Sequence, residues 1–160
     1  MASTDDRQYR RGVYAHWQRT FLQPMLANFD APSREECVGY RIVSNTPQQA
    51  LTLLNDPTFV EAARVFAADL LKSGAASDDA RLDLAFQRAL GRSIRPNELR
   101  SLSAFLGQQR EHLSSDPDEA LKLQKVGLAP KTAGVDPLEL GAWSSLARVI
   151  LNLHEVVTVY

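Results

Sequence analysis

Apolar residues recur at three- and four-residue spacing over most of the chain, which is the pattern of amphipathic helices. The first such stretch, 7–21, carries Tyr9, Val13, Trp17 and Phe21 at four-residue spacing. The only alternating stretch, Val38 to Ile42, has no second strand to pair with, so we expect extended coil there. The pattern predicts an all-α protein, an irregular helical bundle of about six to seven helices.

Short polar residues next to prolines mark where the later helices begin. Thr46, Pro47 and Gln49 stand in the order of a capping box, in which the Thr and Gln side chains each bind the other residue's backbone amide. Asp56 ends that helix and caps the next, because Pro57 cannot lie inside a helix. The remaining predicted caps are Ser77, Asp116 and Asp136 at helix starts, and Gly74 and Gly91 at helix ends.

The last helix, from Pro137 to about Leu153, is apolar on most faces, and we expect it to be central with the other helices packed around it. In the helix that begins at Pro57, Glu61 and Arg64 are interpreted as an exposed pair worth a few tenths of a kcal/mol. Three segments lack a helical pattern. Residues 1–6 are expected to be disordered, 22–46 to be a long irregular N-terminal connection, and 126–135 to be a loop. The conformation of the tail, 156–160, stays open between a frayed extension and a docked strand.

Composition and charge exclude several function classes. The 160 residues are 44% apolar and 23% charged, as in an ordinary globular protein, and their number fits one domain, 1–160. The net charge of -1 gives no broad positive field, so we predict no nucleic-acid partner. Arg7, Arg10, Arg11 and Arg19 are interpreted as a solvated helix face.

No stretch reaches the roughly 20 apolar residues of a membrane-spanning helix, so we predict no membrane insertion. The first twenty residues hold no apolar run, which predicts no signal peptide in this chain. His16, His112 and His154 are far apart in sequence, and Cys37 is the only cysteine. We therefore predict no metal site and no cofactor in this chain.

The strongest candidate for chemistry is the loop 29–46. Arg34 and Arg41 flank Cys37, and their positive charge would favour its reactive thiolate. We favour the alternative, in which Cys37 packs as a small apolar side chain under the loop. Asn45 is a candidate for binding a ligand such as a sugar, although loop hydrogen bonds explain it as well. The candidate ligand-binding residues are thus Arg34, Cys37, Arg41 and Asn45, and no catalytic residue is assigned.

Four blocks of sequence, in this order, resemble a known family. They are FDAPSREECVGYR at 29–41, SNTPQQALTLLNDPTFVEAAR at 44–64, DDARLDLAFQRALGRSIRPNEL at 78–99 and AWSSLARVILNLHE at 142–155. Together they resemble the planctomycete-specific domain of unknown function that lies C-terminal to planctomycete cytochrome c-type domains. The likeness runs from about Arg10 to Glu155 and corresponds to the C-terminal part of that domain only.

The resemblance implies a domain without assigned catalytic residues, in exported or periplasmic proteins that carry haem-binding or carbohydrate-related modules elsewhere. We therefore expect a non-catalytic structural or interaction module of a larger bacterial protein, whose partners are other domains or chains of the same assembly. The alternative is a fragment of a carbohydrate-active or redox enzyme with its site in the loop 29–46. As part of a larger domain, the chain is also expected to leave apolar surface uncovered near Trp17, Phe21 or the tail, and hence to self-associate.

Overall fold

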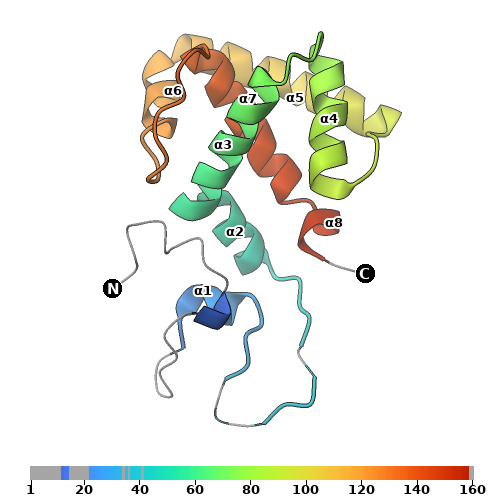
Figure 1. Cartoon of the computed structure of the whole chain (residues 1–160), viewed down its shortest axis with the longest axis vertical. Coiled ribbons are helices and arrows are strands. Elements are labelled where there is room, and N and C mark those ends of the chain that lie inside the picture. The colour runs from blue at the N-terminus through green and yellow to red at the C-terminus, as the bar shows by residue number, and fades with distance from the viewer. Residues whose placement is uncertain (1–11, 15–21, 34, 36, 41, 159–160) are drawn as a thin grey trace. The chain divides into compact units, whose positions relative to one another are not determined.

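The structure is a computed structural model that describes residues 12–14, 22–33, 35, 37–40 and 42–158. These residues form eight α-helices and a turn of 3-10 helix, and no strand is present among them (Figure 1). The predicted all-α fold is therefore confirmed. The chain divides into two compact units, Met1–Thr52 and Leu53–Tyr160. The organisation as one domain, 1–160, stays a prediction.

The predicted N-terminal helix, 7–21, lies outside the described residues except for Gly12–Tyr14, which form the 3-10 turn. The predicted disorder of residues 1–6 lies outside them as well. The connection 22–46 contains one helix that the sequence did not predict, α1 (Pro24–Asn28). Pro24 occupies the first helical position of α1, where its missing amide hydrogen costs nothing.

The next two helices meet at the predicted junction. α2 (Pro47–Asn55) begins with the capping box: Gln49 N donates to Thr46 Oγ1 at 3.2 Å, and Thr46 N donates to Gln49 Oε1 at 3.0 Å. α3 (Pro57–Lys72) follows at once, and Asp56 Oδ1 accepts from Thr58 N at 2.9 Å. Both predicted helix starts are confirmed.

The remaining helices are α4 (Asp78–Leu90), α5 (Pro96–Ser115), α6 (Pro117–Leu123), α7 (Pro137–Leu151) and α8 (His154–Val157). Ser77 and Asp136 cap α4 and α7 with their side chains, as predicted. The prediction for Asp116 is wrong, because its side chain caps nothing although α6 begins next to it. Asp116 also ends α5, where its amide donates to His112 O, and this leaves its backbone outside the usual N-cap conformation.

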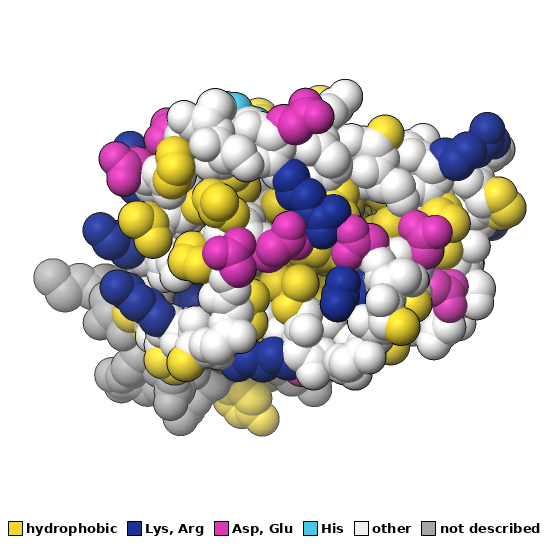
Figure 2. Space-filling view, turned by 90° about the horizontal axis from the view of Figure 1, so that it is seen from above, with side chains coloured by type: hydrophobic (Ala, Val, Ile, Leu, Met, Phe, Trp, Pro, Cys, Tyr) yellow, Lys and Arg dark blue, Asp and Glu magenta, His cyan; other side chains and the backbone are white. Residues whose placement is uncertain are grey.

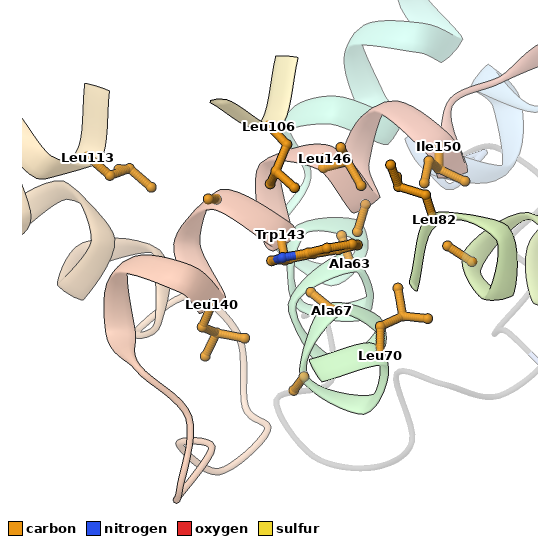
Figure 3. Packing of buried hydrophobic residues seen from close by; sticks show 14 of the residues in the cluster. Ala63, Ala67, Leu70, Leu82, Leu106, Leu113, Leu140, Trp143, Leu146 and Ile150 are labelled. Carbon is orange, nitrogen blue, oxygen red and sulfur yellow. The ribbon is translucent and has the colours of Figure 1, made fainter. Parts of the chain in front are cut away.

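The core of the second unit is centred on α7, as the apolar pattern predicted. α7 contacts α3, α4, α5, α6 and α8, and its Trp143 is fully buried. In Figure 3 the Trp143 ring lies among Ala63 and Ala67 of α3 and Leu106 of α5. Small side chains on α3 leave room for the large indole, which allows α3 and α7 to pack closely.

α7 also holds the junction between α2 and α3. The Arg148 guanidinium donates from Nη2 to the carbonyl oxygen of Leu54, in the last turn of α2. Carbonyl groups at a helix end lack partners inside the helix, and a positive charge is favourable there. Within the described residues, none of the helices combines the length and the apolar composition that crossing a bilayer requires.

Candidate functional site

The structure describes two of the four predicted ligand residues of the loop 29–46. Arg34 and Arg41 lie outside the described residues, whereas Cys37 and Asn45 are both exposed. The favoured interpretation of Cys37 as a packed side chain is wrong, because residues 37–40 and 42–43 are all exposed and enclose no interior. Among the described residues, no hydrogen bond joins Cys37 or Asn45 to another of the candidates.

The base of this loop is held by Asp30, which the sequence did not single out. Asp30 follows α1 with a φ of +59°, in the left-handed region that side chains other than glycine seldom adopt. Its amide donates to Ala27 O, and the amide of Ala31 donates to Leu26 O. These two bonds form a Schellman motif, in which Asp30 takes the place usually filled by glycine.

The carboxylate of Asp30 reaches across the loop to its far end. Ser44 donates to it twice, from its amide at 2.8 Å and from its hydroxyl at 2.6 Å. Gln49, which is buried, donates from Nε2 to the Ser44 hydroxyl at 3.1 Å and to Asp30 Oδ2 at 3.4 Å. Asp30, Ser44 and Gln49 thus tie the two ends of the loop together, at the start of α2.

A second polar cluster lies on α3, where Glu61 and Arg64 are each only 1% exposed. The interpretation of these two residues as an exposed pair is therefore wrong. Glu61 accepts two backbone bonds, from Leu128 N at 2.7 Å and from Ala129 N at 2.6 Å. Arg64 donates to Ala129 O at 2.9 Å and to Pro130 O at 3.2 Å. We call these two side chains the clamp.

The segment that the clamp holds is the connection between α6 and α7, residues 124–136, which contains neither helix nor strand. We call it the clamped loop. Gly127 lies directly against the clamp with a φ of +87°, and a Cβ atom there would come within 2.0 Å of Glu61 Oε2. Glycine is thus required at this position both for its conformation and for the close approach of Glu61.

Both clamp side chains carry a charge, and their burial explains why each is bonded to the loop. A buried carboxylate or guanidinium without partners is strongly destabilised, whereas a buried charge that is paired and hydrogen-bonded is tolerated. Here backbone groups of one short loop bond to both oxygens of Glu61 and to both terminal nitrogens of Arg64, while Arg64 Nε is buried without a partner among the described residues. The clamp therefore fixes residues 128–130 in one place on α3.

Two further networks join helix ends at the surface of the second unit. Arg92 donates to both oxygens of Glu98, at 2.9 and 2.7 Å, and to Glu155 at 2.8 Å, while its guanidinium lies 5.2 Å from the centre of the Phe86 ring. These bonds from Arg92 lower the pKa of Glu98 to about 2 and also lower the pKa of Glu155. Opposite charges in hydrogen-bond contact favour the ionised carboxylate.

The other network joins α4, α5 and α7. Arg110 donates to Glu139 through two bonds of 2.8 Å and to Asp78 at 2.6 Å, and Arg81 donates to Asp78 at 3.0 Å. The bond from Arg110 lowers the pKa of Asp78. Figure 2 shows acidic and basic side chains side by side on the face of the molecule seen from above. Both networks brace helix ends.

Metal binding has no cluster to support it in the part of the chain that the structure describes, because no group of three His, Cys, Asp or Glu side chains could hold an ion there. The sequence missed Asp30, Glu61 and Arg64. Arg64 could have been found, since it lies four residues after Val60 and three before Ala67, inside the apolar stripe of α3.

The fold and these contacts define an all-α protein whose polar side chains hold loops and helix ends. Comparison with protein families matches residues 1–106 to PSD1, described as Protein of unknown function (DUF1553). The match covers more than half of the chain, so the chain belongs to this family. The sequence resemblance is therefore confirmed at the level of a domain of unknown function. Neither the curated proteins nor the solved structures gave a match.

The family match covers only some of the regions described above. It includes the loop 29–46 and both clamp residues, but it ends before the clamped loop and before the block at 142–155. The likeness of that last block to the family stays a prediction.

Proposed function

We propose that this chain is a non-catalytic interaction module. The observation that carries the proposal is the exposure of four large apolar side chains between the tied ends of the loop 29–46. Val38, Tyr40, Ile42 and Val43 are between 55% and 83% exposed. Contiguous exposed apolar side chains are typical of surfaces that bind other proteins.

Five polar residues of the family region support the same proposal, because they already have partners within the chain. Thr46 and Asp56 cap helices, Gln49 serves both a cap and the loop base, and Glu61 and Arg64 bind the clamped loop. Side chains that are bonded internally are unsuited to act on a substrate without first giving up those bonds.

The context we propose is a larger, exported bacterial protein of the planctomycete type, with haem-binding or carbohydrate-related modules elsewhere in it. The support is the sequence resemblance of the four blocks. On this proposal the partners are other domains or chains of the assembly, and any haem belongs to another module. Self-association is proposed as well. Of the surface expected to drive it, Trp17 and Phe21 lie outside the described residues, and Val157 in the tail is exposed.

A second function is a fragment of a carbohydrate-active or redox enzyme that uses Arg34, Cys37, Arg41 and Asn45. The observation that favours it is the exposure of Cys37 and Asn45, which makes both side chains accessible to a substrate.

One experiment separates the two functions. Light scattering over a range of protein concentrations is combined with assays on aryl glycosides and on a redox dye. The interaction module predicts association that the double variant Tyr40→Ser/Ile42→Ser weakens, and no turnover. Turnover that Cys37→Ser or Arg41→Ala abolishes, in a variant that still folds, would overturn the proposal.

A further inference from the structure

We infer that the clamped loop and the end of α6 form a binding surface for an acidic peptide segment that carries an apolar side chain. This inference rests on the proposed function as an interaction module, and it names a second surface and the chemistry of its partner. We call this surface the basic loop surface. It consists of Leu121, Lys122, Lys125, Leu128 and Lys131.

The clamped loop is preformed. Taking the charges of Glu61 and Arg64 out of water is unfavourable, and the four bonds to residues 128–130 offset that cost. The middle of the loop is thereby held in one conformation. A surface that is already ordered loses less conformational entropy when a partner binds, and so binds more tightly.

The surface also carries exposed apolar side chains. Leu128 has its amide bound to Glu61, yet its side chain is 49% exposed. Leu121, on α6, is 46% exposed. A large apolar side chain exposed on a fixed loop, with a second one on the helix that leads into that loop, is suited to contact an apolar side chain of a partner.

The surface is also rich in positively charged side chains. Lys122, Lys125 and Lys131 are exposed, and no acidic residue occurs between Glu119 and Asp136. None of the three lysines forms an ion pair with a described residue. On the left of Figure 2, the side on which α6 lies in Figure 1, basic side chains border hydrophobic ones, with acidic side chains beside them at the upper left. The chain as a whole carries a net charge of -1, so this positive surface is local.

Charge complementarity selects the partner. A local positive charge attracts an acidic segment, and the two leucines favour one with an apolar side chain. Nucleic acid usually requires a wider positive field, and anionic membranes bind clusters of about 4 to 8 basic residues. An acidic peptide therefore fits this surface better than either.

The test uses the full chain and a displayed library of random peptides of about 12 residues, a length that spans a typical peptide-binding surface. We expect the selected peptides to carry Asp or Glu around a Leu, Phe or Trp. In amide chemical-shift mapping, a selected peptide is expected to perturb residues 121–131.

Variants with matched controls locate the binding. Leu128→Ser and the double variant Lys125→Glu/Lys131→Glu are expected to weaken binding of the selected peptide by about tenfold or more. Val65→Ser and Lys72→Glu change exposed residues of the same types on α3, and are expected to change the Kd by less than about twofold. All the changed side chains are exposed, so melting temperatures should stay near that of the unaltered protein.

Glu61→Gln tests the role of the clamp itself. It leaves the whole basic loop surface in place but puts an amide NH2 against a backbone N–H donor. We expect the loop to loosen and the Kd to rise by about three- to tenfold, because preorganisation is lost. A loosened loop with an unchanged Kd would overturn the argument from preorganisation.

The outcomes also separate this inference from the proposed function. Perturbations that fall on residues 38–43 alone would overturn the inference and leave the interaction module standing. Enzymatic turnover that depends on Cys37, together with no selected peptide, would overturn both. Tighter binding of the same surface to phosphatidylserine vesicles or to a single-stranded oligonucleotide than to the selected peptide would overturn the assignment of the partner.

Discussion

Two irregular segments of this chain are held by polar side chains, but at different points and from different places in the chain. The loop 29–46 is held at its ends, where Asp30 and Ser44 are joined with the help of Gln49. The clamped loop is held in its middle, where Glu61 and Arg64 bind residues 128–130. In the first arrangement, the described residues 38–40, 42 and 43 between the ends form no hydrogen bond with a helix, whereas the second divides the loop into two short halves.

The difference has a physical consequence. Closing a loop at its ends reduces the entropy of the chain once, and the residues between the ends keep their freedom. Bonding the middle fixes the residues that are displayed. The loop 29–46 is therefore suited to adapt to a partner, and the clamped loop to present a fixed surface.

The largest effect is expected from Arg64→Met, which keeps the apolar stem and removes the charge. The carbonyl groups of Ala129 and Pro130 would lose their buried charged donor, and the Glu61 carboxylate would stay buried three residues away on the same helix. Removing one buried charged group from its partners costs about 3 to 5 kcal/mol. Denaturant unfolding measures the change. In the double variant Glu61→Gln/Arg64→Met the loss should be smaller than the sum of the single losses. A loss below about 1 kcal/mol for Arg64→Met would mean that the clamp contributes little.

Gly127→Ala is expected to destabilise by about 2 to 3 kcal/mol, through a strained φ and a clash with Glu61. Gly134→Ala is the matched control. Gly134 also has a positive φ, of +79°, but a Cβ atom there meets nothing. Gly134→Ala should therefore lower the free energy of unfolding by only about 1 kcal/mol. Equal losses for the two variants would show that the close approach of the clamp is unimportant.

Asp30→Gly tests the loop 29–46. Glycine accepts the left-handed conformation, so the variant removes the carboxylate without straining the backbone. Losing the acceptor of a part-buried hydrogen bond costs about 1 to 2 kcal/mol. Because these bonds lie at the base of the loop, the loss should affect the loop and leave the helices of the second unit unchanged. The expected result is faster exchange of the Ser44 amide hydrogen, with unchanged exchange in α3 and α7. Unchanged exchange at Ser44 would contradict the tied base.

The smallest effect on stability is expected from lowering the pH. Arg92 lowers the pKa of Glu98 to about 2 in the folded state, below the value near 4.3 of an unfolded glutamate. A lowered pKa gives stability that is present above the unfolded value and is lost as the pH falls towards about 2. The protein should therefore lose more stability between about pH 4.5 and 2 than the Glu98→Gln variant does.

Unfolding at several pH values measures this difference. Glu111→Gln, which changes an exposed glutamate on the same helix, is the control. If Glu98→Gln and Glu111→Gln lose stability equally as the pH falls, then the Arg92 network does not contribute to the acid response.

Much of the fold was predictable from the sequence because capping is local. The bonds of Thr46, Asp56, Ser77 and Asp136 join residues at most three positions apart, so their order in the sequence reveals them. Asp116 was mispredicted because it ends one helix as well as preceding the next.

The clamp was not predictable by the same means. Arg64 bonds to residues 65 and 66 positions further along the chain, and amphipathic patterns place charged residues on the solvent side. The prediction that Cys37 is packed was wrong for a related reason, because neither its residue type nor its neighbours in the sequence show whether the loop is covered. In both cases the missing information was a contact, or the lack of one, between distant segments.

The most direct test of this account is the amide exchange of Leu128 and Ala129, whose N–H groups donate to Glu61. We predict that both amides are protected nearly as well as those of α3, and that Glu61→Gln removes this protection. Rapid exchange of both amides in the unaltered protein, like that of an ordinary exposed loop, would contradict the claim that the clamp fixes this loop.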